Sequence, residues 1–169
     1  MAALATDRIT PKKDPCLLVY PVAASTKIYG GSIVGINSGG YAIPAADAAS
    51  VKVVGVATKQ ADNSAVATNG AINVEVEIGV FRFAAASITQ AMVGTIMYVV
   101  DDNTFDDALG TNGVKAGRLM EFISTTEGWI EVSPSGVGVV LANAGATYTS
   151  AEQNLINDLK TKVNTLLRD

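Results

Sequence analysis

The sequence predicts a mainly β protein, a compact antiparallel β-sandwich or barrel with an extended N-terminal arm and a single C-terminal α-helix. Short β-rich runs separated by Gly and Asn turns fill the centre of the chain. The first 27 residues hold three of the five prolines and no sustained period, whereas an apolar stripe of helical period marks the last 20. We therefore expect an arm over 1–27, a β domain over 28–141, a flexible joint over 142–149 and an amphipathic helix over 150–169.

The expected arm contains Pro11, Pro15 and Pro21 between short apolar pieces. Such a segment cannot build a core of its own, so we expect it to become ordered only by lying on its own body or on a partner. A frayed terminus without a role is the alternative. The candidate contact residues are the apolar run Leu17, Leu18, Val19 and Tyr20.

The first part of the β domain predicts a hairpin. Residues 32–36 and 41–43 are strand-like, and the intervening turn Asn37-Ser38-Gly39-Gly40 supplies residues that tolerate positive φ. Residues 51–58 predict a further strand.

Strict alternation marks the next strand, in which apolar residues from Ile72 to Val80 face one side and Asn73, Glu75 and Glu77 the other. Phe81 and Phe83 then take the opposite parity, which predicts a bulge or bend near Gly79. Further strands are expected over 95–101, 116–124 and 128–133, with 137–141 as a last candidate.

The C-terminal segment predicts a helix. Thr149 and Ser150 stand three residues before Glu152 and Gln153, the spacing of a capping box. The apolar stripe that follows consists of Ile156, Leu159, Val163 and Leu166. This stripe either folds back on the β body or bundles with copies of itself, and the flexible joint favours the second arrangement.

Composition excludes several classes of chemistry. The 169 residues include no histidine and one cysteine, which removes Ser-His-Asp and Cys-His triads, His-containing zinc sites and CxxC redox motifs. The net charge of −4 disfavours nucleic-acid binding. We expect no enzyme activity, no cofactor and no bound metal, and the lone Cys16 fits a reducing cytosol.

Charge and hydropathy vary along the chain. Residues 1–27 carry four basic against two acidic side chains, a net of +2, and residues 28–151 carry five against eleven, a net of −6. Of three long uncharged stretches, 83–100 is the only serious candidate for a membrane span. It contains Ser, Thr, Gln and Gly through its middle and ends in a β-type run, so it indicates a buried strand instead.

Two features invite a binding hypothesis, and each has a plainer explanation. The acidic cluster Asp101, Asp102, Asn103, Asp106 and Asp107 offers oxygens for calcium but lacks the EF-hand order, and a solvated hairpin tip explains it as well. Trp129 offers a face for a sugar ring, yet a lone tryptophan at a strand start is more often an edge anchor or an interface residue. Paired carboxylates for glycoside hydrolysis would have to come from Glu75, Glu77, Glu121 and Glu131, which no motif arranges.

Several short motifs, in order, resemble the capsid cement or head decoration proteins of tailed bacteriophages. They are Tyr20-Pro21-Val22-Ala23-Ala24, Ile28-Tyr29-Gly30-Gly31-Ser32-Ile33-Val34, Val54-Gly55-Val56-Ala57, Gly79-Val80-Phe81-Arg82-Phe83, Val93-Gly94, Tyr98-Val99-Val100-Asp101-Asp102-Asn103-Thr104, Ala116-Gly117 and Gly128-Trp129-Ile130-Glu131-Val132. The resemblance covers residues 17–133; the C-terminal helix lies outside it.

The resemblance implies a structural virion protein, often a homotrimer, that is made in the host cytoplasm and binds the outer surface of the assembled capsid. Its expected partners are the major capsid protein and copies of itself, with no nucleic acid and no membrane. The family has no catalytic motif to transfer. The alternative is a head-fibre or receptor- or glycan-binding module of the same virion, in which Trp129 or the acidic loop touches the ligand.

Overall fold

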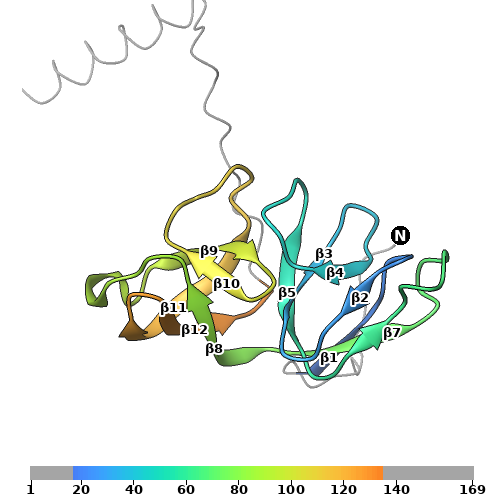
Figure 1. The fold of residues 1–169 in the computed structure, drawn as a ribbon, viewed down its shortest axis with the longest axis horizontal. Coiled ribbons are helices and arrows are strands. Elements are labelled where there is room, and N and C mark those ends of the chain that lie inside the picture. Colours follow the sequence, from blue (N-terminus) through green and yellow to red (C-terminus); the bar gives the residue numbers. More distant parts are fainter. Residues whose placement is uncertain (1–16, 135–169) are drawn as a thin grey trace, which may run out of the picture. The chain divides into compact units, whose positions relative to one another are not determined.

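The computed structural model describes residues 17–134, which form two β-sheets, a small two-stranded ladder and one short 3-10 turn (Figure 1). The first sheet has the order β1-β7-β5-β3-β4, the second is a closed barrel of order β10-β8-β12-β11-β9, and β2 pairs with β6. The strands of the first sheet are β1 (Leu17–Pro21), β3 (Ile33–Ile36), β4 (Ala42–Pro44), β5 (Lys52–Ala57) and β7 (Asn73–Glu77). The barrel strands are β8 (Gly79–Ala85), β9 (Ile96–Asp101), β10 (Thr104–Asp106), β11 (Lys115–Ser124) and β12 (Glu127–Val132). The remaining elements are β2 (Lys27–Ile28), β6 (Ala61–Asp62) and the 3-10 turn η1 (Gln90–Met92).

The hairpin of β3 and β4 forms where the sequence predicts it. The side-chain oxygen Oδ1 of Asn37 accepts hydrogen bonds from the backbone N–H of Gly39 at 2.9 Å and of Tyr41 at 3.0 Å. Gly40 has φ +83°, a conformation that a side chain at this position would strain. The predicted turn chemistry is therefore confirmed.

The first sheet curls toward closure. Its neighbouring strands are all antiparallel, and an isolated parallel bridge joins Val22, just after β1, to Ala42 at the opposite edge. The N–H of Ala23 adds a hydrogen bond to the carbonyl of Ala42 at 2.9 Å. The end of β1 thus reaches the far edge strand and narrows the opening of the sheet.

The burial pattern changes parity near Gly79, where the sequence predicts a bulge or bend. Val74 and Val76 are buried in β7, whereas Phe83 is buried in β8 and Phe81 packs against its core. Ile78 interrupts the two strands. The chain therefore passes from the core of the first sheet to the core of the barrel through this single residue.

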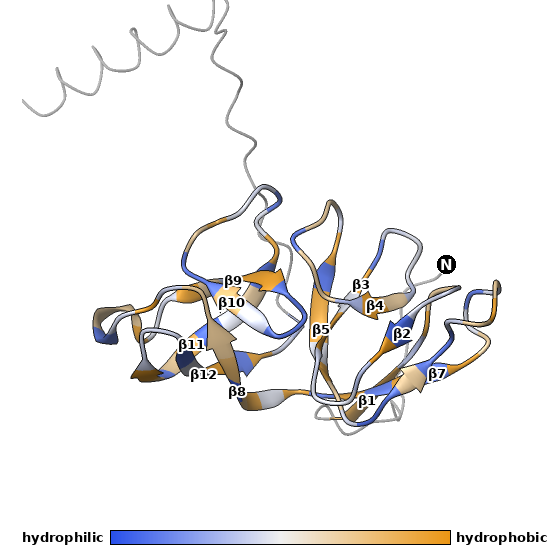
Figure 2. Cartoon of the chain, viewed as in Figure 1, coloured by the Kyte–Doolittle hydropathy of each residue, from blue (hydrophilic) through white to orange (hydrophobic). Residues whose placement is uncertain are grey.

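Two clusters of buried side chains hold the domain together, and the larger one belongs to both sheets. It combines barrel residues such as Phe105 and Leu119 with Ile33, Val53 and Val56 of the first sheet. The smaller cluster combines first-sheet residues such as Val34, Val74 and Val76 with Ile28 of β2 and Ala61 of β6. Strand β5 contributes to both clusters, and most of its length is coloured hydrophobic (Figure 2).

Polar contacts also join the two sheets. The carboxylate of Asp47, after β4, accepts hydrogen bonds from the backbone N–H of Thr111 at 2.6 Å and of Asn112 at 3.0 Å. The N–H of Ile33 donates to the carbonyl of Asp102 at 2.7 Å. These bonds fix the β9–β10 and β10–β11 turns against the first sheet.

The structure agrees with the predicted mainly β class, and most predicted strands up to residue 133 are present within one or two residues at their ends. The exception is the strand predicted from Ile72 to Val80, which ends at Glu77 and is followed by the separate strand β8 to Ala85. The short strands β2, β6 and β10 were not predicted. Within the expected arm, residues 17–21 form β1 and Lys27 begins β2. The strand candidate 137–141, the joint 142–149 and the helix 150–169 lie outside the described residues.

No helix within residues 17–134 is long and apolar enough to cross a membrane.

Candidate interaction surface

The outer side of β8 and β12 combines exposed apolar and charged residues. Trp129 of β12 stands opposite Arg82 of β8, and Glu131 stands opposite Val80. The side chain of Val80 is 47% exposed and that of Trp129 is 36% exposed. Because Val80 is the diagonal cross-strand neighbour of Trp129, the two side chains share one face of the barrel.

Two irregularities in β11 expose further apolar side chains. The register between β11 and β12 shifts between Leu119 and Glu121 and again between Phe122 and Ser124. The residue at each shift is apolar and exposed, Met120 at 45% and Ile123 at 39%. A bulge commonly re-aims a side chain, and here both shifts direct one to solvent. We call Val80, Met120, Ile123 and Trp129 the outer apolar surface.

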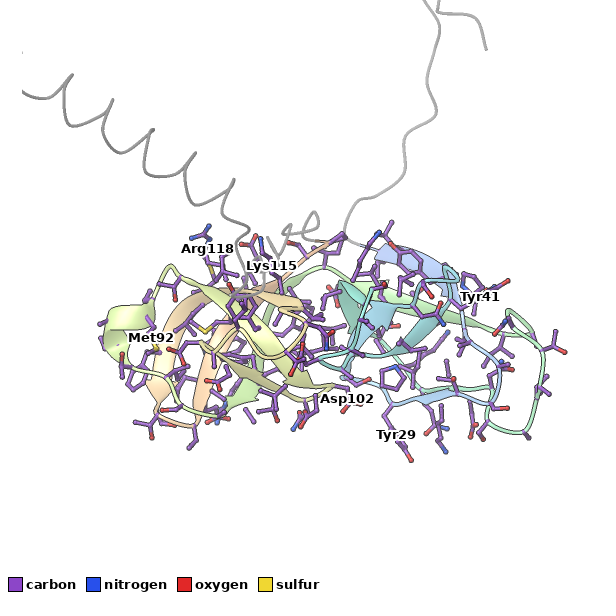
Figure 3. The ribbon with its side chains drawn as sticks, turned by 90° about the horizontal axis from the view of Figure 1, so that it is seen from above. Tyr29, Tyr41, Met92, Asp102, Lys115 and Arg118 are labelled. Atoms are coloured by element: carbon purple, nitrogen blue, oxygen red, sulfur yellow. The ribbon has the colours of Figure 1, made fainter. Side chains whose placement is uncertain are left out.

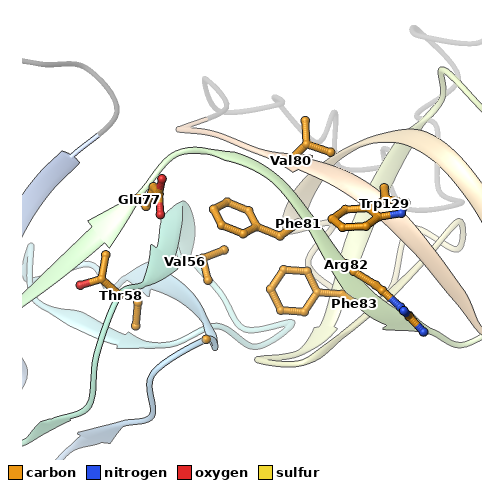
Figure 4. A pocket seen from close by; sticks show the side chains of 10 residues that line it. Val56, Thr58, Glu77, Val80, Phe81, Arg82, Phe83 and Trp129 are labelled. Carbon is orange, nitrogen blue, oxygen red and sulfur yellow. The ribbon is translucent and has the colours of Figure 1, made fainter.

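A groove of about 460 Å³ lies beside Val80 and Trp129 (Figure 4). Four consecutive residues of β8, Val80 to Phe83, line it together with Trp129. The remaining lining residues come from the first sheet and the turn before β3, namely Gly31, Val56, Ala57, Thr58 and Glu77. Most of this lining is apolar, and Glu77 and Arg82 supply the charged groups.

An ion pair fixes Arg82 beside the groove. Its Nε and Nη2 atoms each donate to a carboxylate oxygen of Glu127 at 2.6 Å, which is the two-point geometry that arginine favours. The guanidinium lowers the pKa of Glu127 through this hydrogen bond. The positive charge of Arg82 is therefore already compensated within the chain.

The arm residues predicted to make contacts form strand β1, paired with β7 from Leu17 opposite Glu77 to Pro21 opposite Asn73. Leu17 and Val19 are exposed, at 41% and 48%, whereas Leu18 and Tyr20 pack against the smaller core cluster. Two of the four predicted contact side chains are thus free within the described chain to meet another molecule. The predicted oligomer residues Ile156, Leu159, Val163 and Leu166 lie outside the described residues.

No protein-family model, curated protein or solved structure matches this chain.

The acidic cluster forms the tip of the β9–β10 hairpin and the loop after it. The carboxylate of Asp101 accepts the N–H of Asn103 at 2.8 Å, and that of Asp106 accepts the N–H of Asp107 at 2.8 Å. Partial burial raises the pKa of Asp102, and the charge of Asp101 raises it further. Within residues 17–134, no group of three or more acidic or thiol side chains is arranged to hold a metal ion.

A second exposed polar group lies on the β2–β6 ladder. The Nζ atom of Lys27 is 3.0 Å from Oδ2 of Asp62 and 5.2 Å from the centre of the Tyr29 ring. Tyr29 is 58% exposed and its ring projects outward (Figure 3). The hydroxyl of Ser64 also donates to Oδ1 of Asp62 at 2.6 Å.

Replacing Ser64 with alanine is expected to raise the pKa of Asp62. That pKa lies at about 2, chiefly because the Ser64 hydroxyl donates to the carboxylate and secondly because of Lys27. The charged carboxylate therefore contributes stability at neutral pH that is lost as the pH falls from the ordinary value near 4 toward 2. Carboxyl NMR titration measures the pKa directly, and Lys27→Met should raise it less than Ser64→Ala. Equal pKa values in all three proteins would contradict the assignment.

Sequence reasoning identified Trp129 but missed Met120 and Ile123. In a regular strand, alternate residues face opposite sides. The sequence around Leu119 and Glu121 does not indicate that β11 departs from this alternation at Met120. The groove was also missed, because its lining residues, from Gly31 to Trp129, lie far apart in the sequence.

Proposed function

We propose that this chain is a structural protein of a tailed-bacteriophage virion, which binds the outer surface of the assembled capsid and stabilises it as a cement or decoration protein. The observation that carries the proposal is the outer apolar surface, where Val80, Met120, Ile123 and Trp129 are all exposed on one barrel. Apolar side chains exposed together indicate a surface that another protein covers. The ordered motif resemblance over residues 17–133 supplies the kind of partner, the major capsid protein.

A stabilising role also needs a body that does not deform under load. Here the larger core cluster includes side chains from both sheets, and Asp47 bonds two backbone N–H groups across them. Such a body transmits force between the points at which it is attached. This property suits a protein that holds neighbouring capsid subunits together.

Several weak contacts acting together would give tight binding to an assembled shell. We include in the proposal that Leu17 and Val19 of β1 form a second contact, with a capsid subunit or a neighbouring copy. We also propose that the helix over 150–169 joins copies through Ile156, Leu159, Val163 and Leu166, with a trimer favoured by the resemblance. Free capsid subunits would then bind poorly, because only the assembled shell presents all contacts at once.

Co-sedimentation with phage heads tests the proposal. We expect saturable binding to expanded, undecorated heads of the phage that encodes the protein, little binding to unexpanded heads or free subunits, and heads that survive heating better once decorated. Failure to bind any form of head would refute the proposed function.

Trp129→Ala is expected to weaken head binding by about thirtyfold, since a buried aromatic anchor at an interface contributes about 2 kcal/mol. Tyr29→Ala is the matched control, because Tyr29 is an exposed aromatic outside the outer apolar surface and should leave binding unchanged. Titration of heads with each labelled variant gives the dissociation constants. Equal loss in both variants would remove the outer apolar surface from the proposal.

A glycan-binding module of the same virion is the second candidate, because Trp129 lines a groove together with Phe81. Aromatic faces beside a groove suit sugar rings. Binding on a glycan array, lost in Trp129→Ala, together with failure to bind heads would favour this function over the first.

A further inference from the structure

One edge of β8 lacks a partner strand along the groove. β8 pairs with β12 from Gly79 to Ala84, and on its other side it pairs with β10 only at Ala84 and Ala85. Within residues 17–134, no strand covers that second edge over 79–83. The same stretch supplies the four consecutive β8 residues that line the groove.

Hydrogen-bond alternation identifies the backbone groups at this edge. The N–H of Ala85 donates to the carbonyl of Thr126 at 2.8 Å, so the pairs that include Phe83 and Phe81 bond in the same way with β12. The N–H and C=O groups of Val80 and Arg82 therefore point away from β12. No hydrogen bond joins them to another described residue. They form two donors and two acceptors at the edge of an apolar groove.

The chain before Leu17 starts beside this groove. Leu17 is the register partner of Glu77, and Glu77 lines the groove. Five residues in extended conformation span about 17 Å, at roughly 3.3 Å each. That length matches the β8 stretch that begins shortly after Glu77, so residues 12–16 are long enough to run along it.

The positions of the prolines fit an edge strand. The N–H of Val22 donates to the carbonyl of Ile72 at 3.0 Å, so even-numbered residues of β1 face β7 and Pro21 faces away. Pro11 and Pro15 share the odd parity of Pro21. If the segment before β1 keeps this alternation, Pro11 and Pro15 both face the outer side of the added strand, where no hydrogen-bond donor is needed. An edge strand tolerates proline at such positions.

Charge also favours this segment. Residues 17–134 carry six basic and eleven acidic side chains, a net of −5, whereas residues 12–16 contain Lys12 and Lys13 against Asp14. The carboxylate of Glu127 neutralises the positive charge of Arg82. Arg82 therefore does not repel a basic segment from the groove.

We propose that residues 12–16 add as an extended strand to the open edge of β8 in the same chain and cover the groove. The backbone groups of Val80 and Arg82 bond the added strand, and Pro15, Cys16 and the alkyl stems of the two lysines lie along the apolar lining. This arrangement is strand addition within one chain. It does not depend on capsid binding, and its test needs no phage heads.

The test uses Trp129, the single tryptophan of the chain, as a contact quencher. Continuing the register of Leu17 with Glu77 places Lys12 opposite Arg82, on the barrel face that carries Trp129. The single cysteine is moved by combining Cys16→Ser with Lys12→Cys, and the new thiol is labelled with bimane, whose fluorescence a touching tryptophan quenches. We expect most of the bimane emission to be lost in the full-length chain and recovered when Trp129→Phe is added. Equal emission with and without Trp129 would overturn the proposal.

A pair of substitutions at Val80 separates strand addition from mere proximity. Val80→Pro removes an N–H that an added strand would use and leaves the β8–β12 bonds in place, so the emission should recover. Val80→Thr keeps that N–H and should remain quenched. Amide exchange at Phe81 and Phe83 verifies that β8 is intact. Quenching that persists in Val80→Pro with β8 intact would overturn the proposal.

A mixture of labelled and unlabelled chains shows whether the groove is occupied by the arm of the same chain or by that of a second copy. Labelled chains that carry Trp129→Phe are combined with unlabelled chains that keep Trp129. The emission should stay high, because the segment lies on its own chain. Quenching that appears only in this mixture would assign the groove to the arm of a second copy and overturn the proposal.

Discussion

Replacing Gly117 with alanine is expected to destabilise the protein so strongly that the barrel fails to form or unfolds well below the wild-type temperature. Gly117 lies in β11, and a Cβ atom placed there would overlap the backbone oxygen of Glu131 in β12. That oxygen belongs to a strand bonded on both sides, so neither strand can shift without breaking ladder bonds. The cost should exceed the about 1–3 kcal/mol typical of one extra methyl group in a packed core.

Gly79→Ala is the matched control for this prediction. Gly79 is also a barrel-strand glycine without a positive φ, but an added Cβ would meet only the ring of Phe81 at 3.6 Å, an ordinary contact distance. Thermal unfolding followed by circular dichroism should show that Gly117→Ala lowers the melting temperature by more than about 10 °C. Gly79→Ala should change the melting temperature by less than about 4 °C. Equal melting temperatures for the two variants would show that β11 and β12 separate easily.

The local patterns of the sequence predicted the strands because each one depends on near neighbours in the chain. The Asn37 turn needs an amide side chain two and four residues from the N–H groups that it accepts. The change of burial after Ile78 was visible as a change in the parity of large residues, from Val76 to Phe81. Both features are decided within about ten residues.

Barrel closure and the groove were not predictable in this way. β10 pairs with β8 in parallel over only two residue pairs, and β2 pairs with β6 over two, which leaves no periodic pattern to detect. The groove brings Gly31 and Val56 next to Phe83 and Trp129. Such contacts depend on the register of strands far apart in the sequence.

The candidate surface was predictable only in part. Trp129 was identified from its residue type, and in the apolar run of β1 the exposed side chains are Leu17 and Val19. Which members of that run point outward depended on the pairing with β7. Partial burial of Leu18 and Tyr20 follows from that pairing, and Met120 and Ile123 are exposed because β11 is irregular.

Phe105→Ala is expected to destabilise the whole described domain, by about 3–5 kcal/mol, the usual cost of removing a buried phenylalanine side chain. Phe105 has no exposed surface and lies in β10 between Ala85 of β8 and Val99 of β9. The cluster that it belongs to includes Ile33 and Val53 of the first sheet. The loss should therefore reach both sheets.

Native-state amide hydrogen exchange distinguishes a shared core from two independent ones. In Phe105→Ala, the amides of β3 and β5 should lose protection by the same free energy as those of β8 and β12, because the two sheets unfold as one unit. The exposed Val100→Ala on neighbouring β9 should change protection by less than about 0.5 kcal/mol. Lost protection confined to the barrel would mean that the first sheet stays folded without it, and that the rigid body that we propose for the cement role is two separate units.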